Sequence, residues 1–131
     1  MTKREIGENY FKSGYNCAQS VVLTYADEIG IDKEKALLIS SSFGGGMGRL
    51  CEVCGAFSGM LIVLGALKGY SENNNLTKKQ EYYKVIQSLA EKFKTINGSI
   101  ICRDLLASGK KPCGQLVGDA IDILEEYLNN N

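Results

Sequence analysis

Apolar residues recur every three or four positions along most of the chain, which is the spacing of amphipathic helices. No stretch alternates between apolar and polar residues as a half-buried strand would. The pattern predicts an all-α fold, a bundle of six or so helices that forms a single domain over residues 1–131. The segments expected to be helical are residues 2–11, 17–30, 33–42, 51–69, 77–96, 100–106 and the chain from 112 onward.

Capping residues set several of the predicted helix starts. Asn16 is a favourable N-cap, and Gln19, three residues later, completes a capping box. Asp32 and Ser99 are suited to cap the helices that follow them, and Pro112 is suited to open the last helix. The sequence also predicts the loops between helices, including a basic loop at residues 109–111.

The middle of the chain combines a glycine cluster with its most apolar segment. Four of the five residues 44–48 are glycine, which predicts a glycine-rich loop. The central apolar helix follows at residues 51–69 and is most apolar at 60–67. This run is too short and too rich in glycine for a membrane span, so we expect a core helix and not an integral membrane protein.

Composition narrows the possible functions. The 131 residues carry fifteen basic and fifteen acidic side chains, which gives no basic face for nucleic acid. Histidine is absent, so no Cys–His or Ser–His couple can form. The charged N-terminus lacks the apolar run of a signal peptide, and we expect a cytoplasmic location. There, five cysteines fit metal binding or redox chemistry better than structural disulfides.

Four cysteines are each predicted at or near the start of a separate helix, namely Cys17, Cys54, Cys102 and Cys113. The free amides and the positive dipole end of a helix N-terminus stabilise a thiolate, which a nucleophile, a redox thiol or a metal ligand needs. The alternative for each is a small buried side chain that only fills the core. Cys51 and Cys54 also form a C-x-x-C pair, which is a weak signal without a second such pair or a preceding strand.

Glycines near the central cysteine could let a cofactor approach the backbone closely, and the candidates are Gly45, Gly46, Gly55 and Gly59. The alternative for Gly55 and Gly59 is close packing between helices. A phosphate-binding loop is disfavoured, because the cluster follows a helix and lacks the terminal Lys-Ser/Thr.

The cysteine motifs resemble a known family of redox-active proteins, defined by a CGAxxG motif and four cysteines and labelled C_GCAxxG_C_C. Cys17 in GYNCAQ, Cys54 in CGAFSG, Cys102 in ICRDLL and Cys113 in KPCGQLVGDA match the four pattern positions. Cys51 lies outside the pattern. The resemblance implies redox activity at these four cysteines, with no settled substrate.

Two uses of the cysteines remain open. Cys17, Cys54, Cys102 and Cys113 could ligate an iron-sulfur cluster or another thiolate-bound metal, or they could cycle between dithiol and disulfide. A different class of function is a non-catalytic helical module that binds a small molecule or a protein. The redox partner is left open, a homodimer is compatible with the sequence, and Cys51 is either incidental or a resolving thiol for Cys54.

Overall fold

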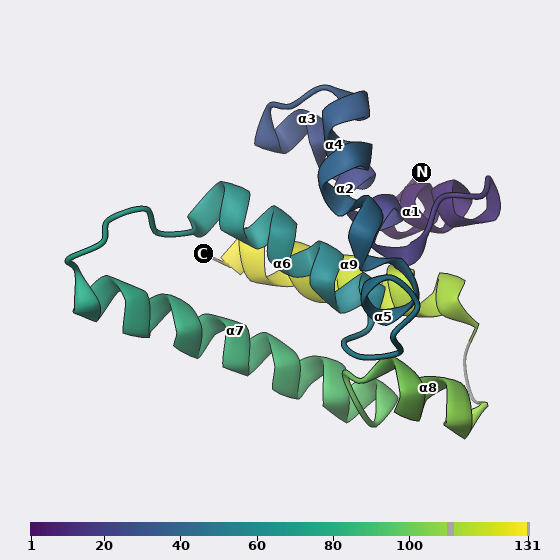
Figure 1. The fold of residues 1–131 in the computed structure, drawn as a ribbon. Helices are drawn as coiled ribbons and strands as arrows, with labels where there is room; N and C mark the ends of the chain where they lie inside the picture. Colours follow the sequence, from purple (N-terminus) through teal and green to yellow (C-terminus); the bar gives the residue numbers. More distant parts are fainter. Residues whose placement is uncertain (110–111, 131) are drawn as a thin grey trace.

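The computed structural model describes residues 1–109 and 112–130, and its described residues are predominantly α-helical (Figure 1). Within them the one isolated β-bridge pairs Val53 with Ile101 in antiparallel orientation. Lys110 and Lys111 of the predicted basic loop lie outside the described residues. The helices are α1 (Lys3–Lys12), α2 (Cys17–Thr24), α3 (Ala26–Ile29), α4 (Lys33–Ser40), α5 (Gly44–Met47), α6 (Gly55–Lys68), α7 (Leu76–Asn97), α8 (Cys102–Ser108) and α9 (Cys113–Asn130), with a 3-10 turn, η1 (Ser41–Phe43), between α4 and α5.

The N-caps predicted for α2 and α4 are confirmed. The Asn16 side chain accepts a hydrogen bond from the Gln19 amide at 2.8 Å, and the Gln19 side chain accepts one from the Asn16 amide at 3.1 Å. Asp32 accepts from the Lys35 amide at 2.7 Å. These bonds satisfy amides that have no partner within the helix and therefore fix where each helix begins.

Helix α6 is the central element, as its composition predicts. Its N-terminal half is buried against α2, and α9 packs beside it (Figure 1). Gly59 permits the close approach of α2, because a Cβ there would lie 2.9 Å from the Ala18 carbonyl oxygen. On the side facing α7, Phe57 packs edge-on against Phe93 with ring centroids 5.7 Å apart.

Helix α1 is held on α9 by a buried glycine and a charged network. A Cβ at Gly118 would lie 2.6 Å from the Arg4 guanidinium, so the glycine makes room for this side chain. Arg4 donates to Asp119 at 2.9 Å and to Asp122 at 2.7 Å. This packing orients the first part of α9, whose first residue is Cys113.

Three predicted boundaries were wrong. The predicted helix 17–30 is interrupted at Tyr25, which ends α2 and precedes the short α3. The central helix begins at Gly55 and not at residue 51, because residues 51–54 instead pair with residues 100–103. Ser99 does not cap α8, since Ile101 occupies the N-cap position.

The glycine cluster folds into the short α5 and a left-handed turn. Gly45, Gly46 and Gly48 have positive φ angles, and so do Met47 and Arg49. Left-handed backbone is unfavourable for residues with a Cβ, which explains why glycine dominates the segment. The turn is tied to the following chain by hydrogen bonds from the Cys51 and Glu52 amides to the carbonyls of Gly45 and Gly46.

No helix within the described residues is both long enough and apolar enough to cross a membrane.

Candidate functional site

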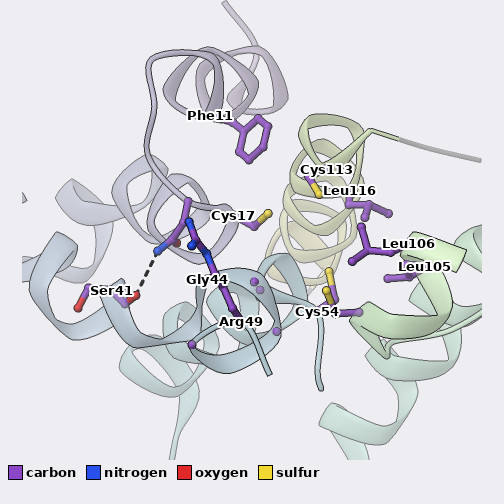
Figure 2. Close-up of a pocket in the computed structure, with 16 residues that line it drawn as sticks. Phe11, Cys17, Ser41, Gly44, Arg49, Cys54, Leu105, Leu106, Cys113 and Leu116 are labelled. Atoms are coloured by element: carbon purple, nitrogen blue, oxygen red, sulfur yellow. Dashed lines mark hydrogen bonds between the residues drawn. The ribbon is translucent and has the colours of Figure 1, made fainter. Parts of the chain in front are cut away.

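A cavity of about 490 Å³ lies where the N-termini of four helices meet α5 (Figure 2). The volume falls in the range of small-molecule sites. Cys17, Cys54 and Cys113 are drawn with their sulfurs directed into the same space. The lining is mainly apolar and glycine-rich and comprises Phe11, Asn16, Cys17, Ser41, Gly44, Gly45, Gly46, Gly48, Arg49, Cys54, Gly55, Cys102, Leu105, Leu106, Cys113 and Leu116.

The four pattern cysteines all line this cavity, and each lies at the start of a different helix. Cys17, Cys102 and Cys113 are the first residues of α2, α8 and α9, and Cys54 is the N-cap of α6. The caps and the helix packing described above therefore converge on one place, and they bring together thiols that are far apart in the sequence.

Cys17 and Cys113 lie at the starts of two helices that contact each other, and each thiol shifts the pKa of the other. Hydrogen bonding by the Cys17 thiol lowers the pKa of Cys113 to about 6, and the Cys113 backbone amide favours its thiolate further. The pKa of Cys17 moves the opposite way, raised far above its ordinary value, because its proton is held by Cys113 and because the side chain is buried. The pair thus resembles a thiolate at Cys113 with a proton donor at Cys17.

Cys54 and Cys102 behave differently from the expectation that a helix start lowers the pKa of a thiol. Burial raises the pKa of Cys54, which is only 3% exposed, although the Ala56 and Phe57 amides favour its thiolate. Burial and the neighbouring Cys51 raise the pKa of Cys102 to about 11. Desolvation of the charged form therefore outweighs the helix terminus at both positions.

The cysteine that neighbours Cys51 is Cys102. The structure does not pair Cys51 with Cys54. The Cys51 thiol contributes to the raised pKa of Cys102, and the two segments are joined by hydrogen bonds from the Arg103 amide to the Cys51 carbonyl and from the Cys102 amide to the Glu52 carbonyl. The predicted helical C-x-x-C geometry is wrong, because Cys51 precedes α6 and has a φ of 60°. Sequence reasoning missed this pair, since its members are distant along the chain.

Three of the four singled-out glycines line the cavity, namely Gly45, Gly46 and Gly55. Gly55 lies against α2, where a Cβ would be 3.1 Å from the Cys17 Cβ. Gly59 lies outside the cavity lining. It permits the close contact between α2 and α6, as expected if its role is helix packing and not cofactor binding. Arg49 adds a guanidinium to the lining, a residue that the sequence did not single out.

The acidic and cysteine side chains do not gather into a metal centre within the described residues. Across residues 1–109 and 112–130, no group of three or more cysteine, aspartate or glutamate side chains is arranged to hold one metal ion. The largest effect on the pKa of Cys17 comes from Cys113, with smaller effects from Cys54 and Cys102. All five cysteines are free thiols in this structure.

The fold and the cavity define an all-helical protein with a cysteine-lined site. Residues 15–127 match the family described as "Putative redox-active protein (C_GCAxxG_C_C)", and the chain belongs to this family. The match spans all four pattern cysteines and the CGAFSG motif. Neither the curated proteins nor the solved structures contain a significant match to the chain.

Proposed function

We propose that the protein is a dithiol/disulfide redox protein in which Cys113 is the nucleophile and Cys17 the resolving thiol. The observation that carries this proposal is that Cys17 and Cys113 begin two contacting helices and line one cavity, where the pKa of Cys113 is lowered to about 6. A thiol with this pKa is mostly thiolate at neutral pH, and the thiolate is the reactive form.

The proposed reaction transfers two electrons from the protein to a small organic disulfide, R–S–S–R. The Cys113 thiolate attacks one sulfur, a mixed disulfide forms, and the first RS⁻ leaves and takes up the proton of Cys17. The Cys17 thiolate then attacks the Cys113 sulfur, which forms the Cys17–Cys113 disulfide and releases the second RS⁻. One S–S bond is broken, one is formed, and the substrate leaves as two thiols once a solvent proton is added.

The cavity supports this reaction in two ways. Its volume of about 490 Å³ can admit a small disulfide, and the lining contains apolar side chains such as Phe11 and Leu116. Arg49 offers a guanidinium to a carboxylate of the substrate. The alternative use of the cysteines, a cluster that needs four thiolates, is supported by their common cavity, but no three of them within the described residues are arranged around one metal position.

Anaerobically purified, reduced protein provides the test. Glutathione disulfide is added, free thiols are alkylated, and tryptic peptides are mapped. We expect residues 13–33, with Cys17, to be linked to the C-terminal peptide with Cys113. Iron and sulfide are measured in the same preparation. Stoichiometric iron and sulfide that disappear when any of the four pattern cysteines is replaced would contradict the proposal, and so would the absence of this linkage.

A further inference from the structure

Cys51 and Cys102 form a second close pair of thiols, at one edge of the same cavity. Cys102 belongs to the cavity lining, whereas Cys51 lies just behind it and outside the family's cysteine pattern. Both side chains are partly exposed. The Cys51 thiol also lies 3.9 Å from the Arg49 carbonyl oxygen, at the end of the left-handed turn, and α5 in this turn contacts α8, which begins at Cys102.

Gly46 gives a geometric measure of this closeness. A Cβ built on Gly46 would lie 2.7 Å from the Cys102 Cβ and 2.9 Å from the Cys51 Cα. Both atoms are therefore close to one point, which makes Cys51 and Cys102 direct neighbours, as a disulfide between them requires. The absence of a side chain at Gly46 and its φ of 71° allow the two cysteines to approach in this way.

Backbone hydrogen bonds hold the two cysteine-bearing segments side by side. The Arg103 amide donates to the Cys51 carbonyl at 3.1 Å, and the Glu52 amide donates to the Gly46 carbonyl at 3.0 Å. The Val53–Ile101 bridge and the bond from the Cys54 amide to the Ile100 carbonyl, at 2.7 Å, extend this contact. Cys51 and Cys102 are thus kept as diagonal neighbours across the two segments.

We propose that Cys51 and Cys102 are a second dithiol/disulfide couple, which reduces the same class of small disulfide independently of Cys17 and Cys113. The inference rests on the proposed function for its oxidant. A thiolate of the couple attacks R–S–S–R and releases RS⁻, which is protonated by solvent. The second thiol transfers its proton to the remaining RS⁻ as it displaces it, so that the Cys51–Cys102 bond forms and the substrate leaves as two thiols.

A consequence concerns the number of electrons that each chain carries. Two couples supply four electrons, and of the five cysteines only Cys54 then stays a thiol in the oxidised protein. Cys54 is the most deeply buried of the five, which agrees with its exclusion from both couples.

Peptide mapping distinguishes this inference from the proposed function. After oxidation of the whole chain with glutathione disulfide and trypsin digestion, we expect residues 50–68 to be linked to residues 95–103. Because residues 50–68 contain both Cys51 and Cys54, the matched variants Cys51→Ser and Cys54→Ser identify the partner. The linkage should be lost in Cys51→Ser and retained in Cys54→Ser.

Each other result has a definite meaning. A linkage that survives in Cys51→Ser and disappears in Cys54→Ser overturns the inference and assigns the partner of Cys102 as Cys54. A protein in which only Cys17 and Cys113 become linked, with three thiols left for alkylation, overturns the second couple while the proposed function stands. If neither linkage forms, both proposals fail.

Discussion

Cys17 and Cys113, the first residues of α2 and α9, line the same cavity, and their pKa values are shifted in opposite directions, which favours the negative charge on Cys113. The two positions are fixed by different parts of the sequence, the Asn16–Gln19 capping box for α2 and the packing of α1 on α9. The first predictions follow from how this pair shares its proton.

Alkylation by iodoacetamide should distinguish Cys113 from the other cysteines at low pH. We expect half-maximal reactivity of Cys113 near pH 6, because the Cys17 hydrogen bond lowers its pKa to about 6. In Cys17→Ala, which has no side-chain donor, the half-maximal pH should rise toward about 8.5, the value of a free thiol. Site-resolved mass spectrometry at each pH measures this. Unchanged titration of Cys113 in Cys17→Ala would show that Cys17 does not lower its pKa.

The free energy of unfolding should depend on pH through the ionisation of Cys113 beside Cys17. The folded pKa of Cys113, about 6, is lower than the unfolded value of about 8.5, so its contribution is present above about pH 8.5 and is lost as the pH falls through 6. The urea midpoint of the reduced wild type should therefore rise relative to that of Cys113→Ser as the pH increases from 6 to 8.5.

Above pH 8.5 the effect of pH on stability reverses, and the folded protein should lose stability as the pH rises. Cys17, Cys54 and Cys102 have raised pKa values, so their thiols ionise in the unfolded chain before they do in the folded one. The wild-type midpoint should fall between about pH 9 and 11, and less so in Cys54→Ala. A midpoint that falls equally in both would mean that burial of Cys54 does not resist its ionisation.

The helix starts could be predicted from sequence because their causes are local. Asn16 and Asp32 cap their helices through side-chain hydrogen bonds to amides three residues away, and such patterns can be recognised in the sequence. The interruption at Tyr25 could not be predicted in this way, because the apolar spacing continues through it and because Tyr25 is buried by tertiary packing.

The cavity cysteines could be singled out from the sequence, but their positions relative to one another could not. The motifs identified Cys17, Cys54, Cys102 and Cys113, and the structure brings them to one cavity. Which thiol keeps its proton depends on burial and on the nearest sulfur, and neither is a property of the local sequence. The pairing of Cys51 with Cys102 likewise results from long-range backbone bonds to residues 100–103.

Removal of the α2 cap should weaken both the fold and the reactive pair. Asn16→Ala removes the bond to the Gln19 amide and the 3.2 Å bond to the Ser41 carbonyl, and we expect a loss of about 1 kcal/mol in the free energy of unfolding. The frayed start of α2 displaces Cys17, so the pKa of Cys113 should rise.

Asp32→Ala is the matched control for this variant, since it removes an equivalent cap from α4, away from the cavity lining. It should lose a similar stability in urea denaturation with no change in the titration of Cys113. An equal effect of both variants on Cys113 would mean that general loosening, and not the position of Cys17, raises its pKa.

Two glycines of α6 should respond oppositely to alanine. Gly59→Ala places a Cβ 2.9 Å from the Ala18 carbonyl oxygen and 3.0 Å from the Val21 Cβ, and we expect a loss of about 1–3 kcal/mol from overpacking. Gly65→Ala meets only the Tyr82 hydroxyl at 3.5 Å, so the higher helix propensity of alanine should stabilise the fold by up to about 1 kcal/mol. Equal thermal midpoints would contradict the close α2–α6 contact.

The assignment of nucleophile and resolving thiol is tested most directly by trapping the mixed disulfide. Reduced Cys17→Ser and Cys113→Ser proteins are each exposed briefly to glutathione disulfide at pH 7, quenched with acid and mapped by mass spectrometry. In Cys17→Ser the resolving thiol is missing, and we expect glutathione to accumulate on Cys113. In Cys113→Ser the buried Cys17 should stay largely unmodified, because burial raises its pKa. Accumulation on Cys17 in Cys113→Ser, with Cys113 unmodified in Cys17→Ser, would contradict the account.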